Sequence, residues 1–147
     1  YIDEILLSLN PKLKRYAKLK IHVTGDDHLN LNSFPGAFAQ IITNLIMNSL
    51  HHAYDETDTG QLGISFNQTN ENRLTLEYSD DGKGIPEENL CRIFDAFFTT
   101  KRDKGGSGLG LLIIHNIVTE QLQGSISVES KEGAGTKFVI DIPMELN

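Results

Sequence analysis

The stretch PGAFAQIITNLIMNSLHHAY, residues 35–54, decides the fold, because it combines a long apolar helix with one polar stripe. Apolar or small side chains occupy almost the whole circumference of the projected helix, which is typical of a buried element. We expect the helix to run from Pro35 to about Tyr54, with Pro35 in its first turn and Ser33 as its cap. Four polar side chains fall within about 80° of one another: Gln40, Asn44, Asn48 and His51. Such a stripe either is satisfied by hydrogen bonds in the core or at the surface, or lines a cleft.

Outward from this helix, short strands and helices alternate along the chain. We expect strands at residues 20–25, 29–34, 61–68, 73–80, 124–130 and 135–143, and helices at 1–18, near 90–94 and at about 108–121. The alternation in 29–34 is weak. The order predicts an α/β (α+β) two-layer sandwich, in which a mixed, mostly antiparallel sheet of about five strands carries about three helices on one face. We expect residues 1–147 to form a single domain.

Composition excludes several classes of protein. With 147 residues and 39% hydrophobic content, the chain is long enough for one buried core. No apolar run approaches the roughly 18 residues of a membrane span, so we expect a soluble domain. The single cysteine, Cys91, permits no internal disulfide and fits a cytoplasmic location. The net charge of −7 argues against nucleic acid as the main partner but allows a small anionic ligand where cations cluster. Because the chain opens on Tyr1 within an expected helix, we expect it to be part of a longer protein.

The segment SDDGKGIP, residues 79–86, is a candidate base-binding loop. Asp80 ends an apolar strand, where a carboxylate can accept a hydrogen bond from an exocyclic amine such as that of adenine. Gly82 and Gly84 would let a flat base approach the backbone, and Ile85 would pack on its ring. The alternative is an ordinary Asp-Gly turn before the next helix.

The segment GGSGLGL, residues 105–111, is a candidate phosphate-binding loop. It leads directly into an apolar helix, whose first backbone amides attract anions. Lys101, Arg102 and Lys104 precede it and supply the local cations that an acidic chain needs to hold a polyphosphate. The pattern differs from a P-loop, because no Lys-Ser or Lys-Thr follows the glycines, and from a dinucleotide fingerprint, because no strand precedes it.

Five segments in order resemble the conserved boxes of sensor histidine kinases. They are NLIMNSL, DDGKGIP, IFDAFFTTK, GGSGLGL and GAGTKF, which match the asparagine box, the first glycine box, the phenylalanine box, and the second and third glycine boxes. The sequence therefore resembles the catalytic and ATP-binding domain of that family, within the Bergerat superfamily that includes DNA gyrase, the large heat-shock chaperones and MutL-type repair ATPases. The resemblance covers about residues 35–143 and implies the Bergerat fold.

The resemblance implies a role for particular residues around Mg²⁺ and ATP. Asn48 matches the magnesium-binding asparagine, and Asn44 lies one turn earlier, beside the triphosphate. Asp80 matches the adenine-binding aspartate, with Gly82, Gly84 and Ile85 around the base. His51 stands where many relatives have a phosphate-binding lysine, so its role is open, since a neutral histidine cannot act as a cation.

The remaining implied contacts fall in the ATP lid, residues 95–108, and in the segments that follow it. Phe94, Phe97 and Phe98 match the phenylalanine box, and Lys101 is the lid cation expected at the phosphates. The second glycine box contributes Gly106, Ser107, Gly108, Leu109 and Gly110, and the third contributes Gly135 and Thr136. A structural turn is an equal alternative for Gly135 and Thr136, and a core position for Phe94.

The resemblance also implies the reaction. Asn48, Asn44 and Lys101 would position and neutralise ATP for transfer of its γ-phosphoryl group to a histidine. Hydrolytic relatives have a glutamate base where this chain has Asn44, which favours a kinase over an ATPase. The acceptor histidine is expected on a dimerisation helix domain outside this chain, so the isolated, monomeric domain is expected to be inactive. The other implied partner is a response-regulator receiver domain, and the parent is expected to be a homodimer that the family often anchors in a membrane.

Three alternatives remain open on sequence alone. The boxes also occur in ATPases or switches of the gyrase and chaperone kind and in serine kinases of the anti-sigma type. A degenerate module that uses the cleft for a partner would also have this fold. None of His22, His28, His51, His52 and His115 has the sequence setting of an acceptor histidine.

Overall fold

A single sheet with helices on one side organises the chain. The computed structural model describes residues 19–25, 36–54, 59–68, 73–95 and 109–143. In chain order its elements are β1 (Leu19–Gly25), α3 (Ala37–His52), β2 (Gly60–Gln68), β3 (Arg73–Asp80), α4 (Glu87–Leu90), α5 (Gly110–Asn116), the π-helical segment η3 (Ile117–Gln121), β4 (Ser125–Lys131) and β5 (Gly135–Pro143).

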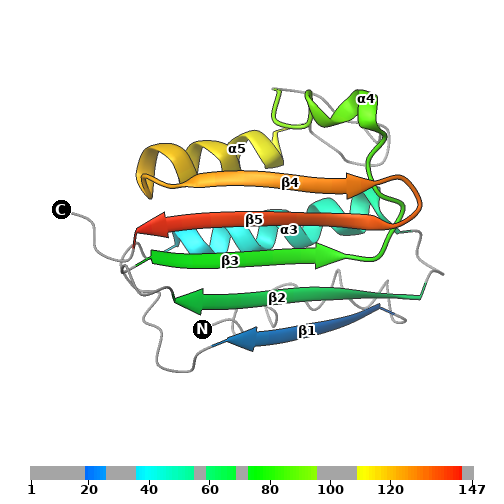
Figure 1. Cartoon of the computed structure of the whole chain (residues 1–147), viewed down its shortest axis with the longest axis horizontal. Helices are drawn as coiled ribbons and strands as arrows, with labels where there is room; N and C mark the ends of the chain where they lie inside the picture. Colours follow the sequence, from blue (N-terminus) through cyan, green and yellow to red (C-terminus); the bar gives the residue numbers. More distant parts are fainter. Residues whose placement is uncertain (1–18, 26–35, 55–58, 69–72, 96–108, 144–147) are drawn as a thin grey trace.

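The strands are arranged in the order β1-β2-β3-β5-β4. β1 runs parallel to β2, whereas β2 and β3, β3 and β5, and β5 and β4 are antiparallel pairs. In Figure 1, α3 lies behind β3 and β5, α5 lies above β4, and α4 lies near the end of β4. This arrangement confirms the predicted two-layer sandwich with a mixed sheet of five strands.

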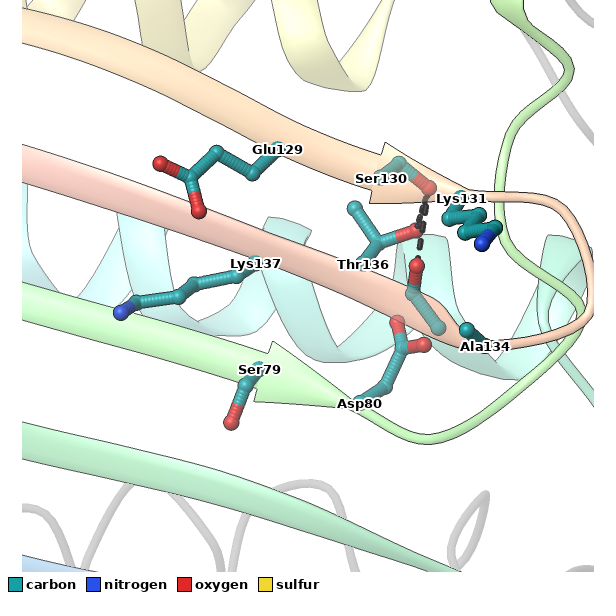
Figure 2. A pocket seen from close by; sticks show the side chains of 9 residues that line it. Ser79, Asp80, Glu129, Ser130, Lys131, Ala134, Thr136 and Lys137 are labelled. Atoms are coloured by element: carbon teal, nitrogen blue, oxygen red, sulfur yellow. Dashed lines mark hydrogen bonds between the residues drawn. The ribbon is translucent and has the colours of Figure 1, made fainter.

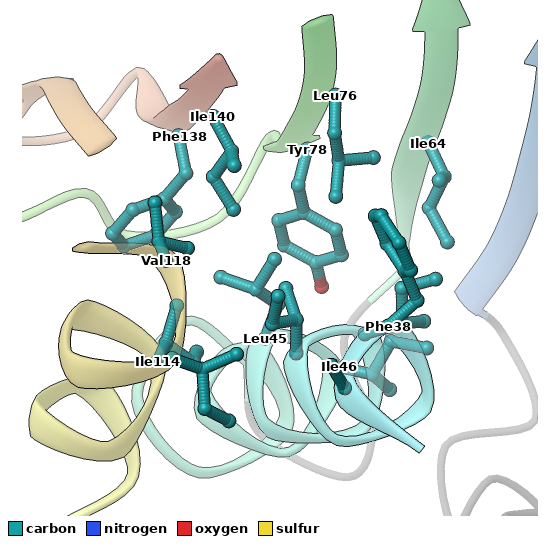
Figure 3. Packing of buried hydrophobic residues seen from close by; sticks show 14 of the residues in the cluster. Phe38, Leu45, Ile46, Ile64, Leu76, Tyr78, Ile114, Val118, Phe138 and Ile140 are labelled. Atoms are coloured by element: carbon teal, nitrogen blue, oxygen red, sulfur yellow. The ribbon is translucent and has the colours of Figure 1, made fainter. Parts of the chain in front are cut away.

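The core lies between α3, α5 and the helix-facing side of the sheet. Burial alternates along β3, where Leu74, Leu76 and Tyr78 are buried and the residues between them are not. Figure 3 shows Leu76 and Tyr78 pointing from the sheet toward α3, where Leu45 lies, with Ile114 of α5 beside them. Full burial of each such side chain contributes about 1.5–3 kcal/mol. The buried face of α3 consists of Ala37, Phe38, Ile41, Ile42, Leu45, Ile46, Ser49 and Leu50.

The start of α3 differs from the prediction. The helix begins at Ala37, and its N-cap is Gly36 in the left-handed conformation (φ 89°) rather than Ser33. The first helical bond joins the Gln40 N–H to the Gly36 carbonyl at 2.9 Å. Glycine adopts this backbone conformation without the steric cost that a side chain would add. The helix therefore begins after Gly36 without a hydrogen bond from a capping side chain.

The short helix expected near residues 90–94 is also displaced. α4 spans Glu87–Leu90, and residues 91–94 form turns. Pro86 precedes the helix and two glutamates occupy its first turn, a composition that favours a helix N-terminus at this point. Beyond α4 the backbone hydrogen bonds join an N–H to the carbonyl three residues earlier, as from the Arg92 N–H to the Asn89 carbonyl. An α-helix would join residues four apart, so this segment forms turns.

The helix expected at about 108–121 is present but changes type. α5 covers Gly110–Asn116, and the chain continues as the π-helical segment η3 to Gln121. The predicted strands at 20–25, 61–68, 73–80, 124–130 and 135–143 are confirmed to within one residue at each end.

Three predicted segments lie wholly or largely outside the described residues. They are the helix at 1–18, the strand at 29–34 and the lid, of which only Asp95 is described. None of the helices in the described parts of the chain is long and apolar enough to cross a membrane.

Candidate nucleotide-binding site

Asp80 is a buried carboxylate at the carboxyl end of β3. Its exposed fraction is 9%, although the other side chains on this face of the strand are hydrophobic. Ser49 of α3 donates its hydroxyl to Asp80 Oδ2 at 2.9 Å, and the Gly82 N–H donates to Oδ1 at 3.1 Å. Burial raises the pKa of the Asp80 carboxyl above its usual value, and the hydrogen bonds from Gly82, Ser49 and the Thr136 backbone partly oppose that rise.

Tyr78 extends this network into the core. Its hydroxyl donates to Ser49 Oγ at 2.8 Å, and both side chains are 1% exposed. Figure 3 shows the Tyr78 ring reaching from β3 toward α3 among apolar side chains. A polar chain from Tyr78 through Ser49 to Asp80 therefore crosses the interface between the sheet and α3.

Asp81, the next residue, has different partners. Its Oδ1 accepts from the Tyr54 hydroxyl at 2.6 Å and from the Gln61 N–H at 2.9 Å, while its own N–H donates to Tyr54 at 3.0 Å. Partial burial acts to raise the pKa of Asp81, but the bonds from Tyr54 and Gln61 outweigh it and hold that pKa below its usual value. Asp81 thus fastens the end of β3 to β2 and to the end of α3.

The two glycines of the loop after β3 are required by protein packing. A Cβ on Gly82 would lie 2.5 Å from the Ala53 side chain. Gly84 has a left-handed backbone (φ 74°), and a Cβ there would overlap the Lys131 carbonyl. The loop is held on both sides, because the Lys83 N–H donates to the Ala53 carbonyl at 3.1 Å and the Ile85 N–H to Ser130 Oγ at 2.7 Å. The loop therefore lies between the end of α3 and the β4–β5 hairpin, and Ile85 is half-buried within it.

The polar stripe of α3 is brought beside α5. Asn44 and Asn48 are half-buried, and the Asn44 amide donates to the Gly110 carbonyl at 3.5 Å. His51 is also half-buried, with its ring 6.4 Å from that of His52 in an edge contact. The stripe and the start of α5 are thus adjacent, although they lie far apart in the sequence.

The start of α5 contains the last residues of the second glycine box. Leu109 is the N-cap of the helix and, like Gly110, is half-buried. Among the described residues no atom lies within 4 Å of a Cβ built on Gly110, so no packing contact there requires a glycine. Phe94 stacks at a tilt on His115 of α5, with ring centroids 5.3 Å apart, and is half-buried as a partly core residue.

Thr136 pairs with Asp80 in the register of β3 and β5 and is 7% exposed. Its hydroxyl lies 2.8 Å from Ser130 Oγ, which also donates to the Gly135 carbonyl at 2.9 Å (Figure 2). An open pocket of about 410 Å³ lies at the ends of β3, β4 and β5, and Asp80, Ser130 and Thr136 contribute to its lining. Its other polar lining residues, Ser79, Glu129, Lys131 and Lys137, give it a mixed charge.

The structure brings together the candidates from four separate boxes. Those that meet around the end of β3 and along α3 are Asn44, Asn48, His51, Asp80, Gly82, Gly84, Ile85, Leu109, Gly110 and Thr136. Phe97, Lys101, Gly106, Ser107 and Gly108 lie outside the described residues. Sequence reasoning missed Ser49, Tyr78, Tyr54 and Ser130. The one available signal was Ser49, a hydroxyl on the apolar face of α3.

The two-layer architecture, with its mixed sheet and the helices on one side, is that of the Bergerat class of ATP-binding domains. The chain belongs to the family described as "Histidine kinase-, DNA gyrase B-, and HSP90-like ATPase", which matches residues 35–146.

Relatives of known name agree with this family. The sensor histidine kinase ZraS of Salmonella typhimurium is 33% identical over 128 residues, which cover 86% of this chain and 26% of that protein. Sporulation kinase E of Bacillus subtilis is 33% identical over 113 residues, or 77% of this chain and 14% of that protein. The chain therefore spans about a quarter or less of the length of these relatives.

Solved structures show the same fold. The nucleotide-free catalytic domain of histidine kinase ThkA superposes with a TM-score of 0.76 at 26% identity, covering 97% of this chain and 90% of that one. Full-length ShkA in complex with AMPPNP shares the fold with a TM-score of 0.72 at 22% identity and covers 97% of this chain and 30% of that one.

Proposed function

We propose that this chain is the ATP-binding catalytic domain of a sensor histidine kinase. The observation that carries the proposal is the convergence along α3, where Ser49 contacts Asp80 of β3 and Asn44 contacts Gly110 of α5. Along one helix, α3 thus contacts a carboxylate that can accept a hydrogen bond from a base, and it carries side-chain amides that can contact a triphosphate. The names of the relatives, which are sensor and sporulation kinases, support the kinase assignment over the other members of the family.

Asp80 would recognise the adenine of ATP. A buried carboxylate is costly unless its hydrogen bonds are filled, and Asp80 has donors from Ser49 and Gly82 but retains further lone pairs. An exocyclic amine is a suitable donor for them. Thr136, its register partner on β5, and Ile85 would complete the base-binding side.

Asn48 would hold Mg²⁺ together with the phosphates of ATP. Magnesium in phosphate-transferring sites is usually bound by one or two protein oxygens plus substrate phosphates, and an amide oxygen is among the ligands it accepts. Asn48 is half-buried, one helical turn from Asn44 and next to Ser49, so its donor chemistry and position fit this role. When bound, the ion would neutralise charge on the phosphates.

The reaction would transfer a phosphoryl group between two nucleophiles. The bond from the γ-phosphorus to the β–γ bridging oxygen breaks, a bond from the same phosphorus to an acceptor imidazole nitrogen forms, and ADP leaves. The chain's own residues position the nucleotide, with Lys101 as a proposed lid cation. Asn44 carries no carboxylate to activate water, which disfavours hydrolysis.

The acceptor histidine would lie on a dimerisation helix domain outside this chain, and the phosphoryl group would pass on to a response-regulator receiver domain. We propose a cytoplasmic position for this domain and a homodimeric parent. Both follow from the kinase assignment, and the first test therefore concerns nucleotide binding alone.

A calorimetric titration with ATP, with and without Mg²⁺, tests the site. Asp80→Asn is expected to weaken ATP binding at least tenfold, the scale of one hydrogen bond to a charged group. Asn48→Ala is expected to abolish most of the strengthening by Mg²⁺. Asp141→Asn on β5 and Asn67→Ala on β2 make the same chemical changes away from the site. Unchanged binding in both site variants would show that the pocket is assigned wrongly.

Phosphotransfer is tested by adding the acceptor-helix domain of the parent protein with labelled ATP. The expected product is an acid-labile, alkali-stable phosphate on that domain. Rapid release of inorganic phosphate without any acceptor would instead identify an ATPase or switch, and an acid-stable product on a serine would identify a serine kinase.

A further inference from the structure

We propose that Tyr78 and Ser49 are positioning residues that fix Asp80 as a hydrogen-bond acceptor and thereby set the preference of the site for a purine with a 6-amino group. The inference rests on the proposed binding of adenine by Asp80. Neither residue belongs to the matched set of nucleotide contacts, and both act through Asp80.

Proton counting gives the chain of hydrogen bonds a direction. The 2.9 Å contact between Ser49 Oγ and Asp80 Oδ2 needs one proton, which an ionised carboxylate cannot supply, so Ser49 donates its only one. The 2.8 Å contact between Tyr78 and Ser49 then needs the tyrosine proton. Every step of the chain points toward Asp80.

Reversal of the chain would be costly. If Asp80 were protonated and donated to Ser49, the Ser49 oxygen could accept from both Asp80 and Tyr78, because a hydroxyl has two lone pairs. The Ser49 proton would then need another acceptor, yet within the described part of the chain this hydroxyl bonds only to Asp80 and Tyr78, and turning it onto the Tyr78 oxygen would leave the tyrosine proton without an acceptor instead. A buried donor without an acceptor is penalised, so Tyr78 at the closed end of the chain favours the ionised, accepting form of Asp80. Burial also raises the pKa of the Tyr78 hydroxyl, which keeps it a donor.

Two hydrogen bonds restrict rotation of the Asp80 carboxylate. One carboxylate oxygen is held by α3 through Ser49 and the other by the Gly82 N–H, so both oxygens are fixed. The remaining lone pairs of Asp80 can accept a hydrogen bond from a 6-amino group. The 6-oxygen of a guanine-type base is itself an acceptor and has no proton to donate to them. Loss of the Tyr78 hydroxyl leaves Ser49 free to turn away and loosens this arrangement.

The test compares ATP with purine riboside 5′-triphosphate, which lacks the 6-amino group and is otherwise alike. Wild type is expected to bind ATP at least tenfold more tightly than this analogue. Tyr78→Phe is expected to reduce that ratio about threefold to tenfold while the affinity for the analogue stays within about twofold. Tyr54→Phe is the matched control, because it also removes a tyrosine hydroxyl, in this case one that donates to the neighbouring carboxylate, Asp81. This substitution is expected to leave the ratio of the two affinities unchanged.

Ser49 is tested with two substitutions of equal shape. Ser49→Thr keeps the hydroxyl and Ser49→Val removes it, so any difference in the ATP-to-analogue ratio reports the hydrogen bond and not the added volume. The ratio is expected to be several times higher for Thr than for Val. Thermal melts confirm that each variant is folded before it is compared.

The outcomes separate the two proposals. If wild type binds both nucleotides equally, the contact between Asp80 and the amine is wrong and the proposed function loses its base site. If wild type discriminates but Tyr78→Phe keeps the full ratio, or weakens both nucleotides equally, the positioning role is overturned and Tyr78 is only a core residue.

Discussion

Adjacent carboxylates, Asp80 and Asp81, have opposite environments. Asp80 faces α3 within the core, where burial raises its pKa, while Asp81 is exposed and its hydrogen bonds to Tyr54 and Gln61 lower its pKa. Successive side chains of an extended backbone point to opposite faces, so Asp80 contacts Ser49 of α3 while Asp81 anchors the end of β3 to Tyr54 and Gln61.

The raised pKa of Asp80 predicts a particular dependence of stability on pH. Its contribution to stability is fully present below the unfolded value of 3.8 and is lost as the pH rises through the higher folded pKa. The difference in free energy of unfolding between wild type and Asp80→Asn is therefore expected to shift in favour of wild type as the pH falls from 7. Urea denaturation across that range measures it, and a difference that is independent of pH would contradict the raised pKa.

Gly84 offers a second prediction at the scale of one residue. Gly84→Ala adds a Cβ against the Lys131 carbonyl to the cost of a left-handed backbone, which alone is about 1–2 kcal/mol. Gly133→Ala is the matched control, since Gly133 has φ 86° but no described atom within 4 Å of its Cβ position. Urea denaturation is expected to show at least twice the loss for Gly84→Ala, and equal losses would mean that the contact with Lys131 costs nothing.

Among the elements, α3 combines structure and site. Its apolar periodicity predicted the helix to within two residues, because burial of that face dominates its stability. The prediction failed where local backbone chemistry decides, at the Gly36 cap and at α4. The π-helical segment after Asn116 was also missed, because a change from α to π hydrogen bonding leaves little trace in apolar spacing.

The end of η3 predicts a stabilising substitution. Gln123 follows the segment in the left-handed conformation (φ 57°), which a glycine adopts more readily. Gln123→Gly is expected to raise the free energy of unfolding by about 0.5–1 kcal/mol in urea denaturation. Gln121→Gly, inside the helical segment, is expected to lower it by about 1 kcal/mol. Destabilisation by both would show that Gln123 is not strained.

Across the whole molecule, the site depends on contacts between distant segments. Local sequence patterns predicted the polar stripe of α3 and Asp80 as candidate site residues. Their assembly was not predicted, because the Ser49–Asp80 contact spans 31 residues and the Asn44–Gly110 contact spans 66. Ser49, Tyr78 and Ser130 escaped prediction for the same reason, since each acquires its role only from a partner on another element.

The strand order predicts where the molecule is most stable. β3 pairs with β2 on one side and β5 on the other, whereas β1 and β4 are paired on one side only within the described sheet. Hydrogen exchange is therefore expected to be slowest in β3, approaching the rate of global unfolding, and faster in β1. Equal protection of β1 and β3 would show that the sheet opens as one unit.

None of the strands of the described sheet comes from residues 81–124. The chain leaves it after Asp80 and returns at Ser125, while β2, β3, β5 and β4 pair directly with one another. The entropy lost in closing such an excursion grows only logarithmically, by about 0.6 kcal/mol for each doubling of length. Insertions after Asp95 in this connection are therefore expected to change the free energy of unfolding little, whereas deletion of Ile93 or Phe94, which pack in or against the core, is expected to lower it.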